Sequence, residues 1–299
     1  MRQTWPAAVL LDRLRAAPQY LLPHHLLSRL MLRATRSLKP WWKNTLIHWF
    51  KGHFGVDMSE VQESDPHAYA SFNAFFTRAL RPDARPLPKA RDAIISPVDG
   101  TVSQVGRIQG EQILQAKGHD FTLSELLGGD TARARPFHAG HFATLYLSPR
   151  DYHRIHMPFT GQLRDTTYIP GRLFSVAPYT VRSVSGLFAR NERLSVRFIT
   201  DAGPMAMILV GALFVGCIET VWAGVVTPPH RHWTRVQRFD APGSDRIDLQ
   251  RGEEMGRFNM GSTVILLFGP NAVAWHDELR PGAHLRMGQI IGRALPCSE

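Results

Sequence analysis

Three short segments of this sequence combine residue types that could do chemistry, and the first contains a serine directly after a glycine. In Gly261-Ser262-Thr263 this pair opens the apolar run Val264–Phe268. Because glycine has no Cβ, the serine hydroxyl could approach the glycine carbonyl, and the backbone could take strained angles. Most Gly-Ser pairs are turns, so this segment alone predicts no activity.

The other two segments supply an acid and two bases. Asp99 lies in Ser96–Gly100, where an Asp-Gly pair between apolar runs is usually a hairpin turn. The alternative is that the Asp99 carboxylate orients a histidine. His153 and His156 lie in Asp151–Pro158, and their spacing puts them on one face of a helical turn but on opposite faces of a strand. Either imidazole could serve as a general base.

Other common site motifs are missing. The sequence has no P-loop, GxGxxG, HExxH or GxSxG motif, and its two cysteines exclude a disulfide framework. Fourteen histidines suggest a metal site, and the close pairs are His138/His141, His153/His156 and His230/His232. No cysteine cluster accompanies them. We therefore predict no metal, and we expect His230 and His232 to be surface residues.

The elements that must position these segments change in type along the chain. Before residue 55 the pattern is helical, and from about residue 95 short runs of Val, Ile, Thr, Phe and Tyr alternate with Gly, Pro and Asp. The expected strands are Phe142–Leu147, Leu194–Ile199, Met205–Val215, Ile218–Val226 and Ser262–Phe268. One short helix is expected at Leu123–Leu127, and Pro82–Pro88 is typical of a connector. The sequence thus predicts an α+β fold, with N-terminal amphipathic helices followed by a β-rich catalytic domain.

Two stretches near the N-terminus are amphipathic at helical period. In residues 26–38, one face carries Leu26, Leu27, Leu30, Met31, Ala34 and Leu38, and the other carries Arg29, Arg33 and Arg36. In residues 41–51, one face carries Trp41, Trp42, Leu46, Trp49 and Phe50, with Lys43 and Lys51 away from it. Basic residues opposite Leu, Trp and Phe are typical of helices that lie in a membrane interface. Two alternatives are helices docked on the protein's own core and a mitochondrial presequence.

The net charge of +10 is concentrated in the same region. Residues 1–55 contain nine basic side chains and one acid, while residues 56–299 are close to neutral. A nearly neutral body argues against a nucleic-acid binder, and a basic arm indicates attachment to an anionic surface. The longest apolar run, Met205–Ile218, is too short to span a bilayer.

Taken together, these segments resemble the phosphatidylserine decarboxylase family over nearly the whole chain. The matching segments are Leu114–His119, Tyr146–Arg154, Leu187–Arg193, Glu219–Gly224 and the Gly261-Ser262-Thr263 cleavage site. One departure is Met260, where bacterial members usually have leucine, a change that conserves volume. The intact set of Asp99, His156 and Ser262 argues against an inactive relative.

The resemblance implies self-cleavage between Gly261 and Ser262, which leaves a pyruvoyl group derived from Ser262 as the covalent cofactor. It assigns the base to His156 and its orienter to Asp99. The pyruvoyl group would form a Schiff base with phosphatidylserine and release CO2, giving phosphatidylethanolamine. His153 is the candidate proton donor, or a structural histidine. Phe174, Ser175 and Val176 are expected to line the headgroup pocket.

The implied organisation is a membrane-associating region at 1–60, a catalytic body at 61–261 and a pyruvoyl-bearing alpha chain at 262–299. The alpha chain would pair with the beta chain 1–261, in a higher homo-oligomer. We expect peripheral attachment to the cytoplasmic side of the cell membrane, where phosphatidylserine in an anionic leaflet is the partner. The alternative function is a pyruvoyl-dependent decarboxylase of a soluble amino acid.

Overall fold

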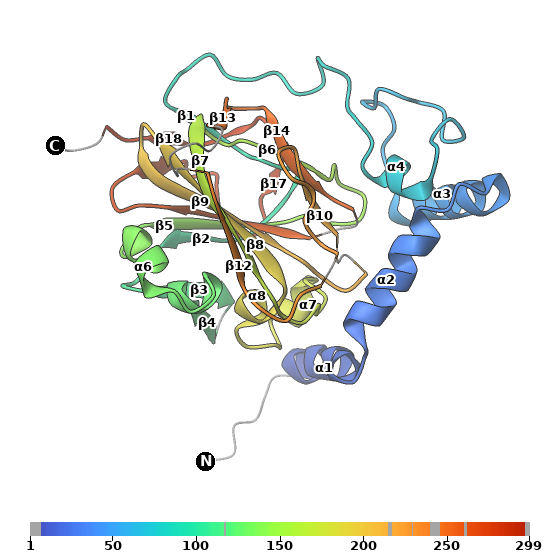
Figure 1. Ribbon diagram of the computed structural model, residues 1–299, viewed down its shortest axis with the longest axis horizontal. Coiled ribbons are helices and arrows are strands. Elements are labelled where there is room, and N and C mark those ends of the chain that lie inside the picture. Colours follow the sequence, from blue (N-terminus) through green and yellow to red (C-terminus); the bar gives the residue numbers. More distant parts are fainter. Residues whose placement is uncertain are drawn as a thin grey trace.

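The computed structural model describes residues 7–116, 118–214, 217–228, 230–239, 246–259 and 262–296, with the side chains of residues 7–9 left out. Four α-helices and a 3-10 helix come first, and the β-strands follow from residue 93 (Figure 1). The first helices are α1 (Ala7–Ala16), η1 (Ala17–Tyr20), α2 (His24–Thr35), α3 (Pro40–Phe54) and α4 (Phe72–Phe76). This order confirms the predicted α+β fold.

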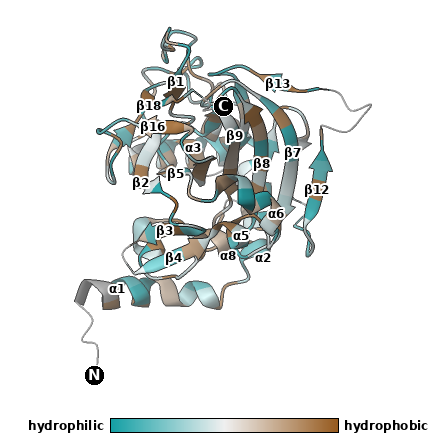
Figure 2. Ribbon diagram, turned by 90° about the vertical axis from the view of Figure 1, so that its left-hand side faces the viewer, coloured by the Kyte–Doolittle hydropathy of each residue, from teal (hydrophilic) through white to brown (hydrophobic). Residues whose placement is uncertain are grey.

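A nine-stranded antiparallel sheet forms the centre of the body, in the order β12-β7-β8-β9-β15-β5-β2-β17, with β13 also paired to β7. Its strands are β2 (Gly100–Arg107), β5 (His141–Tyr146), β7 (Gly161–Ile169), β8 (Arg193–Thr200), β9 (Gly203–Val210), β12 (Arg235–Arg238), β13 (Asp248–Leu249), β15 (Thr263–Phe268) and β17 (His284–Leu285). Every residue of β15 is buried, between β9 and β5. Figure 2 shows that the middle strands are the most apolar part of the sheet.

Smaller elements surround this sheet. One sheet has the order β11-β10-β14-β6, another has the order β1-β18-β16, and β3 pairs with β4. Their strands are β1 (Ala93–Ile95), β3 (Gln112–Ala116), β4 (His119–Thr122), β6 (Arg154–His156), β10 (Ile218–Thr220), β11 (Gly224–Val225), β14 (Glu254–Phe258), β16 (Val273–Trp275) and β18 (Ile290–Ala294). The short helices are α5 (Leu123–Leu126), α6 (Thr131–Ala134), η2 (Arg135–Phe137), α7 (Pro178–Val181) and α8 (Leu187–Arg190).

The predicted strands are confirmed in place, with two differences in extent. The strand expected at Met205–Val215 ends at Val210, and the run Ile218–Val226 forms two short strands, β10 and β11, that pair with each other. Gly224 has a positive φ of 63° at the start of β11, a conformation that favours glycine and lets the chain reverse there. The predicted short helix is present as α5, where Thr122 and Glu125 form a capping box.

The N-terminal helices run along one side of the β body (Figure 1). α1 packs against α7, and Asp12 accepts a hydrogen bond from Arg182 Nε at 2.8 Å. Farther along, α3 and α4 share a separate hydrophobic cluster that includes Ile47, Phe50 and Phe72. Among the described residues, no helix has both the length and the apolar character needed to cross a bilayer.

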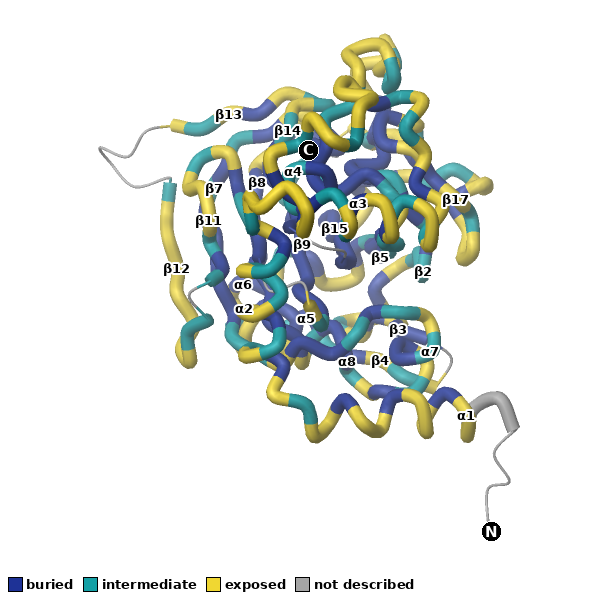
Figure 3. The backbone as a smooth tube through the Cα atoms, turned by 90° about the vertical axis from the view of Figure 1, so that its right-hand side faces the viewer, coloured by how far each residue is buried: buried dark blue, intermediate teal, exposed yellow. Residues whose placement is uncertain are grey.

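The apolar face of α2 is only partly covered by the body. Its buried residues are the polar His24, Ser28 and Thr35, while Leu26 and Leu30 are each more than half exposed. His24 explains this orientation, because its ring lies 2.6 Å from the Gln19 carbonyl and accepts the Leu173 N–H at 3.1 Å. Figure 3 shows the exposed stretches along α1 to α3. This apolar face is therefore not fully docked on the protein's own core.

In α3 the predicted apolar face is divided. Trp41 and Trp49 are 67% and 54% exposed, whereas Phe50 is buried, so only part of the predicted face is open to solvent. The Phe50 ring packs against Phe72 at 5.0 Å between centroids. Lys43 also points inward, where its Nζ donates to the His67 carbonyl at 2.8 Å. The physical reason is that α4 offers an aromatic surface that the helical period of residues 41–51 does not reveal.

Candidate active site

Ser262 lies at the entry of β15, the buried central strand. Its side chain is fully buried, its Oγ donates to the Val210 carbonyl, and its own carbonyl accepts the Leu147 N–H at 2.9 Å. The other half of the predicted cleavage site, Gly261, lies outside the described residues, as does Met260. The serine is thus held between the ends of β9 and β5.

Asp99 is brought to the same edge of the sheet by the start of β2. Thr101 pairs with Tyr146, the last residue of β5, and a Cβ on Gly100 would lie 2.4 Å from the Tyr146 carbonyl oxygen. Only glycine permits this approach, which puts Asp99 next to the segment that holds Ser262. β1 pairs with β18 rather than with β2, so the hairpin turn considered for Asp99-Gly100 is not formed.

The Asp99 carboxylate accepts hydrogen bonds from a cationic side chain and from a backbone amide. Arg85 donates to it from Nε at 3.2 Å and from Nη2 at 2.5 Å, and the Met287 N–H donates at 2.6 Å. Glu60 binds the same guanidinium at 2.7 Å. Among the described contacts, Asp99 makes no hydrogen bond to His156. Sequence reasoning missed Arg85, because a single arginine in the connector has no pattern that marks it.

His156 is oriented by two other groups. It ends β6, its N–H donates to the Pro97 carbonyl at 2.9 Å, and its Nδ1 lies 2.8 Å from the Gly252 carbonyl. Because a carbonyl only accepts, Nδ1 carries the proton and Nε2 accepts from the Tyr152 hydroxyl at 3.0 Å. Burial is the largest influence on its pKa, which lies below the usual value, while the Asp99 charge acts in the opposite sense.

His153 is the more deeply buried of the two histidines. Its Nδ1 donates to the Asp151 carbonyl at 2.8 Å, and its ring packs on Phe76 at 4.1 Å. Its Nε2 has no hydrogen-bond partner among the described residues. The Phe258 N–H donates to the His153 carbonyl at 3.1 Å, so this histidine lies beside the chain that leads to Ser262. His153 comes just before β6 and His156 is its last residue. The two imidazoles therefore have different neighbours.

Burial lowers the pKa of His153 to about 3. Between the unfolded pKa of 6.5 and about 3, the unfolded chain binds a proton here that the folded chain does not. Stability from this histidine is therefore complete above pH 6.5 and is lost as the pH falls toward 3. Between about pH 7 and pH 4.5, we expect the free energy of unfolding of the protein that keeps His153 to fall. This fall should be about 3 kcal/mol larger than the fall in the His153→Asn variant. Urea unfolding of both proteins in the uncleaved Ser262→Ala background measures this, and equal pH dependence would contradict it.

An apolar cavity of about 400 Å³ lies between the N-terminal helices and the body, beside the segment that holds Ser262. Its walls include Trp49 of α3, Leu147 after β5, and the predicted residues Ser175 and Val176. Phe174 does not line this cavity. It packs against Tyr20 and His24, and its N–H and carbonyl bind the Asn191 side chain. Ser175 and Val176 thus line this cavity, and contact of residues 174–176 with the substrate headgroup stays a prediction.

The expectation that His230 is a surface residue is wrong. Its side chain is only 4% exposed, and its Nδ1 lies 2.8 Å from Glu192, whose side chain is 1% exposed. His232 is exposed, as expected. The two histidines diverge because residue 230 turns under the start of α2, a contact that no local pattern indicates.

A family model described as phosphatidylserine decarboxylase matches residues 72–293, and one described as PSD matches residues 14–55. The phosphatidylserine decarboxylase proenzyme of Stutzerimonas stutzeri is 55% identical over 283 residues, covering 95% of each chain. That of Azotobacter vinelandii is 56% identical over 283 residues, or 95% of this chain and 99% of the relative. That of Bordetella bronchiseptica is 56% identical over 287 residues, or 96% of each. The chain belongs to the phosphatidylserine decarboxylase family.

Proposed function

We propose that Ser262 is the source of the pyruvoyl group with which this phosphatidylserine decarboxylase converts phosphatidylserine into phosphatidylethanolamine. The observation that carries the proposal is the position of Ser262, which is buried at the head of β15 and whose carbonyl accepts the N–H of Leu147, a residue that lines the apolar cavity. The proenzyme is cleaved into alpha and beta chains, and we assign residues 262–299 to the alpha chain and 1–261 to the beta chain.

The residues around Ser262 fit a pyruvoyl group. Such a group has two carbonyl oxygens that need donors, and the hydroxyls of Ser148 and Thr263 are buried without hydrogen-bond partners among the described residues. Such a group would supply a carbonyl that can react with the amine of the serine headgroup and a sink for the electrons left when CO2 departs. The chain's own residues then have to orient the headgroup, exclude water and move protons.

For self-cleavage we assign Ser262 as nucleophile, His156 as base and Asp99 as the group that supports the charged imidazole. Ser262 Oγ attacks the Gly261 carbonyl carbon and converts the amide into an ester. Elimination then breaks the bond between Ser262 Cβ and the ester oxygen, and hydrolysis of the new terminus releases ammonia. Burial lowers the His156 pKa, which keeps Nε2 unprotonated and able to accept the serine proton. The Asp99 charge raises this pKa, which favours the imidazolium once it has formed. Tyr152 must release Nε2 before it can accept the serine proton.

Replacing either supporting residue is expected to block maturation. His156→Ala removes the base and Asp99→Asn removes the charge that favours the imidazolium, so both proteins should remain uncleaved on a gel for hours. His138→Ala is the matched control, since that side chain is 47% exposed and lies outside the site. Normal cleavage of both site variants would contradict these roles.

For decarboxylation we assign His153 as the group that returns a proton to the substrate carbon. Its Nδ1 proton is held by the Asp151 carbonyl, so Nε2 presents a lone pair toward buried space and can carry a proton between partners. Burial and then the Arg78 charge lower the pKa of this imidazole, so Nε2 is free to accept a proton. In this assignment His153 takes up one proton during the reaction and passes it to the substrate carbon.

The lipid substrate explains the exposed apolar face of the N-terminal helices. Removing a phosphatidylserine chain from a bilayer costs about 0.8 kcal/mol per CH2, so the active site must come to the membrane. The cavity between α3 and Leu147 offers an apolar route from these helices toward Ser262. We infer peripheral docking on the cytoplasmic leaflet, where anionic lipids attract the basic arm. The homo-oligomer implied by the family resemblance stays a prediction.

The function is tested by offering the purified protein two substrates. We expect CO2 release from phosphatidylserine in vesicles and none from free serine. Equal release from free serine would favour the alternative, a decarboxylase of a soluble amino acid.

A further inference from the structure

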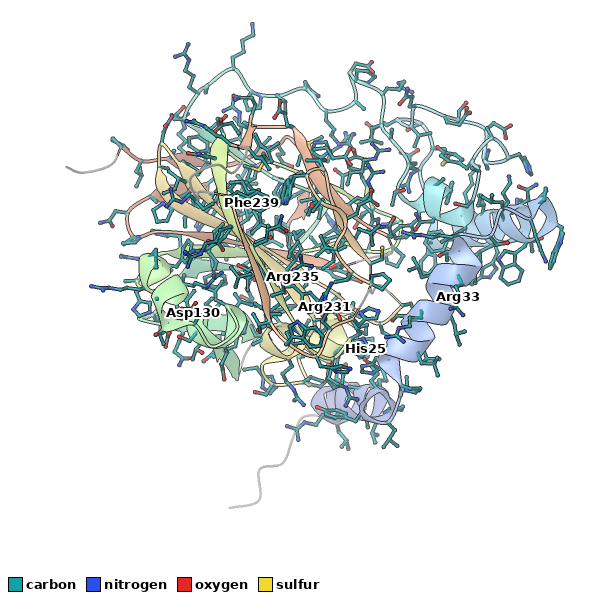
Figure 4. The ribbon with its side chains drawn as sticks, viewed as in Figure 1. His25, Arg33, Asp130, Arg231, Arg235 and Phe239 are labelled. Carbon is teal, nitrogen blue, oxygen red and sulfur yellow. The ribbon has the colours of Figure 1, made fainter. Side chains whose placement is uncertain are left out.

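A second cluster of chemically capable side chains lies at the start of α2, formed by His25, Glu192 and His230. The three residues come from α2, from the position before β8 and from the loop after β11. One ligand atom of each lies within 4.8 Å of the other two. His25 is labelled in Figure 4, next to Arg231, at the foot of α2.

The protonation pattern leaves one nitrogen of this cluster without a partner. His25 Nε2 lies 3.0 Å from the Gly171 carbonyl and therefore carries the proton. His25 Nδ1 is then a bare lone pair, buried and without a hydrogen-bond partner among the described residues, 3.9 Å from Glu192 Oε2. The lone pair of His25 Nδ1 and the Glu192 carboxylate repel each other, so the carboxylate cannot serve as the hydrogen-bond partner that this buried nitrogen needs.

The hydrogen-bond partners of the cluster residues are of the kind that metal ligands usually have. A ligating histidine usually donates its other N–H to a carbonyl, as His25 does to Gly171. The Glu192 carboxylate is held by the Tyr168 hydroxyl at 3.1 Å. The Glu192 backbone is fixed as well, through Arg172 at 2.7 Å and Gly211 at 2.8 Å.

We propose that His25 Nδ1, Glu192 and His230 Nδ1 bind a divalent transition metal of the zinc type. Two imidazoles and one carboxylate form a ligand set that such ions take in preference to Mg²⁺ or Ca²⁺. His230 Nδ1 already lies 2.8 and 3.0 Å from the two Glu192 oxygens. The proton on this nitrogen lies between it and the carboxylate, where the metal ion would bind. Binding releases that proton to water, and the cation replaces it between nitrogen and carboxylate.

Access and local charge are compatible with this site. His25 and His230 both line a surface cavity, which gives an entry path and space for a fourth ligand such as water. Arginines also line this cavity, but two of them are directed onto other groups. Arg172 donates to the Tyr20 carbonyl at 2.8 Å, and Arg231 lies over the Trp233 ring.

The ion would tie the N-terminal helices to the catalytic body. His25 belongs to α2, whereas Glu192 and His230 belong to the body, so one metal bonds both parts directly. The spacing of histidines along the sequence did not indicate this site, because its ligands are separated by long stretches of chain.

The test uses the full-length protein without a histidine tag, dialysed against Zn²⁺ and counted by elemental analysis. We expect one bound ion per chain, and a Co²⁺ visible spectrum typical of nitrogen and oxygen ligands. His25→Ala and His230→Ala should each weaken binding at least tenfold, while His232→Ala, an exposed neighbour, should not. Hydrogen exchange at the start of α2 should slow when Zn²⁺ is added to the unaltered protein and not to the variants.

Self-cleavage of each variant shows that it has folded, since none of these histidines belongs to the assigned active site. A folded protein that binds no stoichiometric ion overturns the proposal, as does binding unchanged by both His25→Ala and His230→Ala. These readouts do not depend on decarboxylation, so the metal site and the catalytic assignment can fail separately.

Discussion

Ser262→Ala is expected to purify as one uncleaved chain of about 33.7 kDa without any decarboxylase activity. Alanine has no hydroxyl to attack the Gly261 carbonyl, so neither the peptide-bond cleavage nor the pyruvoyl group can arise. The unaltered protein should show two masses, for residues 1–261 and 262–299, with the smaller chain lacking a free amino terminus. Intact mass spectrometry distinguishes the two results directly.

Ser195→Ala is the matched control, because it removes a buried serine from β8 of the same sheet. This variant should be cleaved as the unaltered protein is. Two masses from Ser262→Ala, or a single active chain from the unaltered protein, would contradict the assignment of Ser262.

The double variant Leu30→Glu, Trp41→Glu is expected to lose binding to phosphatidylserine vesicles. These side chains are 51% and 67% exposed on the outward faces of α2 and α3. Burying each in a membrane interface contributes roughly 1.5–3 kcal/mol, so losing both should weaken binding by about a hundredfold or more. Vesicle flotation measures the bound fraction.

Ile199→Glu controls for the added charge, since Ile199 is 47% exposed at the end of β8, away from the helices. That protein should float with vesicles normally, and continued self-cleavage should show that both proteins are folded. Undiminished flotation of the double variant would mean that another surface contacts the lipid.

Local pattern was sufficient to predict the type of most elements. The apolar alternation and punctuation of the body indicated strands such as Val264–Phe268, and helical period indicated α2 and α3. The direction of each face was not predictable in the same way. A helical period distinguishes two faces, but contacts such as that of His24 with Leu173 decide which face meets the body.

The active-site residues could be named from short motifs, but their partners could not. Asp99 was expected to orient His156, yet in the structure Arg85 binds Asp99 and Tyr152 binds His156. Arg85 comes from the connector between the helices and the body, and its contact depends on how that connector crosses the sheet edge. The catalytic pairing of Asp99 with His156 stays a prediction for the variants to test.

The residues themselves set the chemistry that is available, because the identity of Ser262 and its neighbours limits which bonds can be made. Which of these groups meet depends on how the whole chain packs. Strand register brings the start of β2 and the end of β5 to the entry of β15, and helix orientation brings His25 to Glu192. Such contacts join residues far apart in the chain, and they depend on the packing of the whole sheet rather than on any local preference.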